Sequence, residues 1–143
     1  MSLTDRARRA TVDVVQTATD QRRSRWSRSV VVPVRDGHAP DARDFMRELE
    51  ASRKSEYARS EERIGITKEV WFLAGIPGGD ALIGYMETDD FANALGSFSR
   101  SQDDFDLWFK RRMADCTGVD LNDPPAMTLP ELLSHYSAQE AYA

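Results

Sequence analysis

The sequence predicts an α+β fold in which helices cover one face of an antiparallel sheet. Two runs of β-prone residues flank a Pro-Gly-Gly turn, which is typical of a hairpin, and a third such run precedes them. Stretches with apolar residues at helical spacing lie between the first run and the hairpin, and again after the hairpin. With a short last strand, this order is the ferredoxin-like βαββαβ pattern.

The size and composition are those of one ordinary globular domain. The chain has 143 residues, of which 41% are hydrophobic and 30% are charged, which excludes collagen-like, low-complexity and wholly disordered proteins. No apolar run reaches the roughly 18 residues of a membrane helix, and charged residues interrupt any secretory signal near the N-terminus. The single cysteine, Cys116, cannot form an internal disulfide. We therefore expect a cytoplasmic protein without a membrane partner.

Residues 1–28 form a basic arm that precedes an acidic body, residues 29–143, which we expect to fold as a single domain. The arm carries a net charge of +4, whereas the body carries −9. The helical face of the arm is mostly alanine and would bury little area, so the arm is expected to be helical or disordered. Arginine-rich arms can bind nucleic acid through its phosphates. Because the body is acidic and no base-reading element follows, nucleic acid is not the expected partner.

The first strand and the first helix follow the arm. The β-branched run Ser29–Val34 reads as a strand, in which Pro33 is tolerated only at an unpaired edge or a bulge. After a turn, the pair Pro40-Asp41 opens a helix that is expected to continue to about Arg63.

A β-hairpin is the clearest local signal. The runs Thr67–Gly75 and Ala81–Glu87 pair across the glycine-rich turn. A turn centred on the two glycines would place Trp71 opposite Met86 and Phe72 opposite Tyr85. Because strand side chains alternate, one face of the hairpin is wholly apolar and is assigned to the helices. Its members are Trp71, Leu73, Gly75, Leu82, Gly84 and Met86.

Two more helices and a short tail complete the expected fold. Thr88-Asp89-Asp90 is a cap for a helix over residues 91–98, and Asp103-Asp104 opens another that ends at Gly118. A short strand at Ala126–Leu129 and a last helical turn at Glu131–Tyr136 are expected in the proline-rich tail.

The second face of the sheet predicts self-association. It receives Val70, Phe72, Ala74, Ile83, Tyr85 and Glu87, which are mostly apolar. Two helices cover only one face of a sheet, and burying the other at about 25 cal/mol per Å² favours association. A homodimer that stacks sheet on sheet would satisfy this face, so a second copy of the chain is the expected partner.

The stretch from about Ser29 to Glu131 resembles the dimeric α/β-barrel superfamily, and within it the DUF6176-like group of small bacterial proteins. The resemblance rests on the charged helix 41–63 running into Ile64–Phe72, and on the aromatic-rich stretch Phe105–Lys110 before two prolines. It implies a ferredoxin-like fold and a homodimer. The superfamily includes cofactor-independent monooxygenases, haem-degrading enzymes and proteins with no known activity, so whether this chain is an enzyme is left open.

Four residues form the candidate ligand-binding set: His38, Phe72, Tyr85 and Glu87. His38 follows the first strand and could act as a base or a ligand, or be a solvated turn residue. Tyr85 and Glu87 share a strand face with Phe72 and could supply polar groups to an apolar pocket, or lie at the rim of a dimer interface.

Two functions remain in competition. The chain binds a small apolar or aromatic molecule, or it is a cofactor-independent monooxygenase-like enzyme whose His38, Tyr85 and Glu87 converge on one enclosed cavity. With only two histidines, about a hundred residues apart, no local metal motif can be written, and we expect neither metal nor cofactor.

Overall fold

A computed structural model describes residues 27–123 and 130–138. The chain divides into two units, Ser27–Pro130 on one hand, and residues 1–26 with Glu131–Ala143 on the other. All strands and helices named below belong to the first unit. Most of the basic arm and the expected strand at Ala126–Leu129 lie outside the described residues. Residues 131–136 contain no helix, so the prediction of a last helical turn there is wrong.

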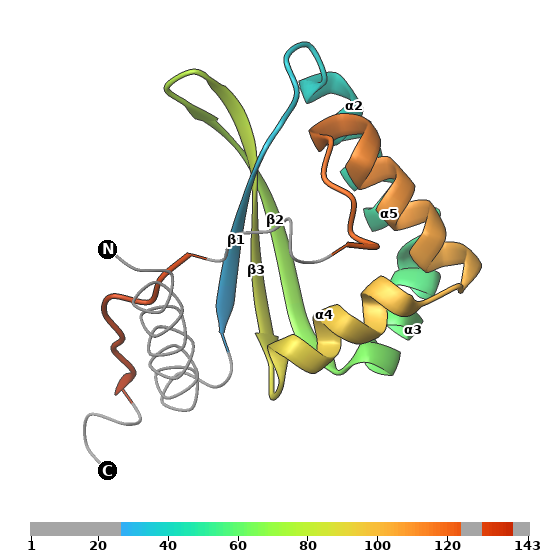
Figure 1. Cartoon of the computed structure of the whole chain (residues 1–143), viewed down its shortest axis with the longest axis vertical. Coiled ribbons are helices and arrows are strands. Elements are labelled where there is room, and N and C mark those ends of the chain that lie inside the picture. Colours follow the sequence, from blue (N-terminus) through green and yellow to red (C-terminus); the bar gives the residue numbers. More distant parts are fainter. Residues whose placement is uncertain (1–26, 124–129, 139–143) are drawn as a thin grey trace, which may run out of the picture. The chain divides into compact units, whose positions relative to one another are not determined.

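The described residues form a three-stranded antiparallel sheet and four helices, which confirms the α+β class. The strand order is β1-β3-β2, and the helices lie on one side of the sheet (Figure 1). In chain order the elements are β1 (Arg28–Pro33), α2 (Ala39–Glu50), α3 (Lys54–Ile64), β2 (Ile66–Ile76), β3 (Gly79–Thr88), α4 (Phe91–Arg100) and α5 (Asp104–Thr117). Within the described ranges, no helix has both the length and the apolar character needed to cross a membrane.

The hairpin exists, but its register differs from the predicted one by two residues. Its turn is Pro77-Gly78 rather than Gly78-Gly79, because proline favours the first central position of a type II turn and Gly78, at φ 93°, supplies the positive φ of the second. Trp71 therefore pairs with Gly84 and not with Met86. A shift of two residues preserves the alternation of side chains, so the assignment of residues to the two faces is unaffected.

The inner face of the sheet packs against the helices as predicted. Leu82 and Met86 are buried, and Trp71 packs against the core. A Cβ atom at Gly84 would lie 2.8 Å from the Trp71 ring and 2.9 Å from the Val30 side chain. Glycine is therefore required at this position, because the indole lies directly over the backbone of β3.

The long helix expected from residue 41 to residue 63 is two helices, α2 and α3. At the break, the backbone N–H of Ala51 is shared between the carbonyls of Arg47 and Glu48, and Arg53 also donates to Glu48. This tightened turn ends α2 although neither glycine nor proline lies in it. Arg53 then places its guanidinium carbon 4.5 Å from the centre of the Trp108 ring.

Helices α4 and α5 begin at the predicted caps and α5 ends at the predicted glycine, whereas α4 continues to Arg100, two residues beyond the predicted end. Asp90 and Asp103 each accept a hydrogen bond from a backbone N–H of the first turn, at 3.0 Å in both cases. Gly118 ends α5 with φ 76°. These caps orient α5 so that its aromatic side chains enter the core, where Phe109 lies 5.0 Å from Phe45 between ring centres.

Candidate functional site

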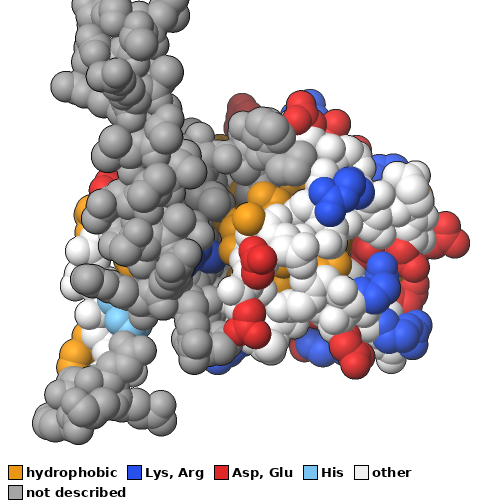
Figure 2. Space-filling view, turned by 60° about the horizontal axis from the view of Figure 1, so that its bottom comes forward, with side chains coloured by type: hydrophobic (Ala, Val, Ile, Leu, Met, Phe, Trp, Pro, Cys, Tyr) orange, Lys and Arg blue, Asp and Glu red, His pale blue; other side chains and the backbone are white. Residues whose placement is uncertain are grey.

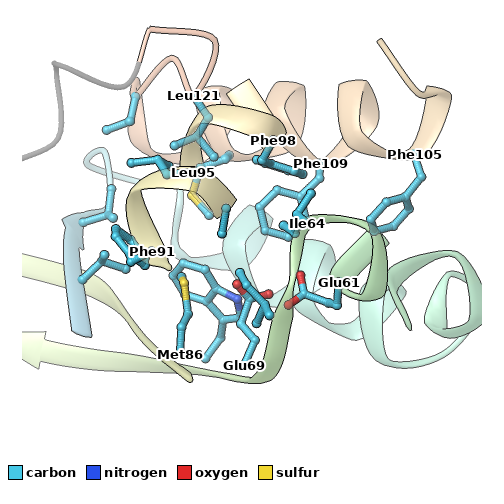
Figure 3. A pocket seen from close by; sticks show the side chains of 17 residues that line it. Glu61, Ile64, Glu69, Met86, Phe91, Leu95, Phe98, Phe105, Phe109 and Leu121 are labelled. Atoms are coloured by element: carbon cyan, nitrogen blue, oxygen red, sulfur yellow. The ribbon is translucent and has the colours of Figure 1, made fainter. Parts of the chain in front are cut away.

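An apolar cavity of about 60 Å³ lies between the inner face of the sheet and helices α3, α4 and α5. All three strands contribute to its wall. Figure 3 shows side chains from these elements pointing into the same space. The apolar lining includes Val30, Met86, Phe91, Phe98, Phe109 and Met113.

Two glutamates interrupt this apolar wall. Glu61 comes from α3 and Glu69 from β2, and their carboxyl groups point toward one another (Figure 3). A register shift between Ile66 and Lys68 explains how β2 supplies Glu69. Residues three positions apart on a regular strand point to opposite faces of the sheet. The bulge adds one residue to β2, so Ile66 and Glu69 both line the cavity.

Tyr57 and Trp71 surround the carboxyl group of Glu69. The Tyr57 hydroxyl donates a hydrogen bond to Glu69 Oε2. The indole N–H of Trp71 is near enough to lower the pKa of Glu69, yet Trp71 Nε1 is buried and has no aligned hydrogen-bond partner among the described residues. Glu61 Oε2 is likewise buried without a partner in this part of the chain. The site thus contains one donor and one carboxyl oxygen whose hydrogen-bonding capacity is not used.

The environment favours the protonated form of the acid pair. Burial, followed by the negative charge of Glu69, raises the pKa of Glu61 to about 9. Burial also raises the pKa of Glu69, although the hydrogen bond from Tyr57 and the nearby polar groups of Trp71 and Glu61 oppose the shift. Burial and the adjacent carboxylates raise the pKa of Tyr57, so its hydroxyl stays a donor. The pair consequently keeps at least one proton at neutral pH.

The charges closest to the pair are negative. Asp106 of α5 adds to the negative potential at Glu61. Farther out, the face of the molecule in Figure 2 carries acidic and basic side chains around apolar patches, so both signs of charge are mixed there. An anionic ligand would be repelled at the polar end of the cavity, whereas a neutral hydrogen-bonding group would not.

A proton-holding acid in an apolar cavity can donate a hydrogen bond to a ligand or transfer a proton. The described residues contain no group of three or more His, Cys, Asp or Glu side chains that could hold a metal ion. Glu61, Glu69 and Tyr57 can supply hydrogen bonding and proton transfer in this way.

The residues predicted from the sequence lie elsewhere. Tyr85 and Glu87 do meet, because the Tyr85 hydroxyl donates to Glu87 Oε1 at 2.8 Å, and this bond raises the pKa of Tyr85. His38 lies at the start of α2, with Nδ1 2.8 Å from Asp41 Oδ2. Phe72 is 57% exposed on the outer face. Other residues line the cavity, so a ligand-binding role for this set stays a prediction.

Sequence reasoning missed the acid pair, although one signal for it existed. The predicted apolar face of the hairpin includes Gly75, Leu73 and Trp71 of β2. The next residue of β2 on this helix-covered face is Glu69. A charged residue on a helix-covered face is unusual and marks a candidate site. Glu61 gave no such signal, because it lies among many charged residues of its helix.

Comparisons of the chain with protein-family models, curated proteins and solved structures find no match, so the function has to be inferred from the site itself.

Proposed function

We propose that the chain is a homodimeric, ferredoxin-like α/β-barrel protein that binds a small apolar molecule in the cavity between its sheet and its helices. The observation that carries the proposal is the apolar cavity itself, which has buried polar groups at one end only. Sites for small molecules combine a mostly apolar wall with a few placed polar groups.

The strand order supports the ferredoxin-like part of the proposal. The order β1-β3-β2 is that of three strands of the βαββαβ pattern, all antiparallel. Among the described residues β1 pairs only with β3, so its other edge is where a fourth strand would pair. Pro33, the last residue of β1, cannot donate to a neighbouring strand, so a fourth strand would have to pair with the residues of β1 before it.

The outer face of the sheet supports the dimer. Val31, Ile83 and Phe72 are paired in a row across the three strands. Val31 is 47% exposed and Phe72 57% exposed. Large apolar side chains that are exposed side by side favour association with a complementary surface, and the same face of a second copy is such a surface.

Replacing Phe72 with lysine is expected to convert the dimer into a monomer. A charge at the β2 end of this row would have to be buried without a partner in the sheet-to-sheet interface. Sedimentation equilibrium would measure the change, with Ala58→Lys on the exposed side of α3 as the matched control. A wild-type protein that sediments as a single 16.2 kDa chain would contradict the dimer.

Filling the cavity is expected to abolish binding of a small apolar probe. Ala94 is fully buried in α4 and lines the cavity, so Ala94→Val adds two methyl groups to that space. Xenon occupies apolar cavities, and its ¹²⁹Xe chemical shift reports the binding. We expect saturable xenon binding to the wild type and to Ala92→Val, which changes the exposed side of the same helix, but not to Ala94→Val. Equal xenon shifts for all three proteins would refute a binding cavity.

The acid pair favours proton-transfer chemistry as a second function, which keeps the cofactor-independent monooxygenase-like enzyme as the alternative. A buried carboxyl whose pKa is near 9 can exchange a proton with a bound substrate at neutral pH. In this alternative the acid–base role belongs to Glu61 and Glu69, not to His38. Turnover that Glu61→Gln abolishes would distinguish the enzyme from the binding protein.

A further inference from the structure

We propose that the cavity selects a small neutral alcohol, whose hydroxyl group accepts a hydrogen bond from Trp71 Nε1–H and donates one to Glu61 Oε2. This inference rests on the proposed function, because it requires that the cavity hold a small molecule. It goes further by assigning the chemical class of that molecule and the two groups that recognise it.

The two recognition atoms are complementary to a hydroxyl group. Trp71 Nε1 can only donate, and it has no partner among the described residues. Glu61 Oε2 is a buried carboxyl oxygen, which can accept a hydrogen bond, and it has no partner among the described residues. A hydroxyl group accepts and donates at once, so a single group satisfies both atoms. Leaving either of them unpaired in an apolar cavity would be unfavourable.

Charged ligands fit this end of the cavity less well. A carboxylate would be repelled by Glu69 and by Asp106, which both add negative potential at Glu61. An ammonium group could donate to Glu61 Oε2, but it has no lone pair for the indole N–H and would leave Trp71 unpaired. A hydrocarbon would fill the apolar part and satisfy neither atom.

The volume restricts the size of the alcohol. The cavity volume of about 60 Å³ is well below the roughly 150 Å³ of a cavity that holds benzene. The ligand is therefore small, and we take isobutanol, a short branched alcohol, as the probe. The cavity as it stands therefore favours a short aliphatic chain over an aromatic ring.

The full-length ¹⁵N-labelled protein allows a direct test through its indole N–H signals. The chain has three tryptophans, and Trp71→Phe and Trp108→Phe assign two of the three signals. Four probes of matched shape are titrated: isobutanol, 2-methylbutane, isobutylamine and isobutyrate. We expect isobutanol to move the Trp71 signal downfield in a saturable way, while the Trp108 signal serves as the control for non-specific solvent effects. We expect no comparable shift from the other three.

The variants separate the hydrogen bond from apolar contact. Trp71→Phe is expected to weaken isobutanol binding about tenfold, because it removes one buried hydrogen bond, and to leave 2-methylbutane binding nearly unchanged. Trp108→Phe, a change of equal size outside the cavity lining, should alter neither.

Three results would overturn the assignment. If 2-methylbutane binds as tightly as isobutanol and Trp71→Phe has no effect, the cavity binds apolar molecules without selecting alcohols, and the proposed function survives alone. A larger Trp71 shift with isobutylamine would assign the site to a cation. If none of the four probes binds and xenon does not bind either, the cavity holds water only, and both proposals fail.

Discussion

The Asp106→Ala variant is expected to lose about 2–4 kcal/mol of unfolding free energy, because a buried acceptor of several hydrogen bonds is removed while its ionic partner Arg63 stays 44% exposed. The Asp106 side chain is fully buried in the first turn of α5. It accepts hydrogen bonds from Ser60, from Ser101 at 2.5 Å and from Arg63 Nη1 at 3.0 Å. Removing the carboxylate would disconnect α3 and the α4–α5 connection from α5, and would leave two hydroxyl groups without an acceptor.

The same contacts fix the sign of the pH dependence. Burial alone would raise the pKa of Asp106, but the hydrogen bonds from Arg63, Ser101 and Ser60 outweigh it, so the pKa is below the ordinary value. The stabilisation by Asp106 is therefore complete above the unfolded-state pKa of about 4 and is lost as the pH falls through the lower folded-state value.

Urea denaturation at pH 7 and at pH 3 would measure both effects. The loss caused by Asp106→Ala should be smaller at pH 3 than at pH 7, because pH 3 lies below the unfolded-state pKa of about 4. Asp115→Ala, an exposed position on the same helix, is the control and should change the unfolding free energy by less than about 0.5 kcal/mol. A loss no larger for Asp106→Ala than for Asp115→Ala would show that the cluster does not hold α3 to α5.

Patterns of alternation and capping predicted most of the fold. The two faces of the hairpin were predicted correctly although its register was wrong. A register error of two residues leaves every side chain on the same face, because side chains alternate with a period of two. The caps at Asp90, Asp103 and Gly118 were found because a local side chain or a positive φ determines each of them. Local rules of this kind need no knowledge of tertiary contacts.

The break between α2 and α3 and the acid pair could not be predicted in the same way. Residues 51–53 contain no helix-breaking residue, so only the packing of each helix decides where α2 ends. Glu61 and Glu69 come from different elements, eight positions apart, and only the folded chain brings them to one cavity. His38 and Tyr85 were chosen by residue type and position, whereas the cavity is defined by the face that the helices cover.

The Glu61→Gln variant is expected to be more stable than the wild type at pH 8, by on the order of 2–4 kcal/mol. Burial and the neighbouring Glu69 raise the pKa of Glu61 to about 9, whereas an unfolded glutamate ionises near 4.3. Between these values the folded state binds more protons than the unfolded state. The unfolding free energy of the wild type therefore falls as the pH rises through this range, by at most about 1.4 kcal/mol per pH unit.

Glutamine removes this dependence, because its amide does not ionise while its N–H can still donate to Glu69. Denaturant unfolding from pH 5 to pH 9 should give a steep decline for the wild type and a flatter profile for Glu61→Gln. Glu62→Gln, the exposed neighbour on α3, should keep the wild-type slope. Parallel profiles for the wild type and Glu61→Gln would mean that Glu61 ionises normally in the folded protein. Another outcome is that the Glu61→Gln variant is more stable and no longer binds isobutanol. That result would show that the buried acid serves ligand recognition at a cost in stability, which is common for residues of functional sites.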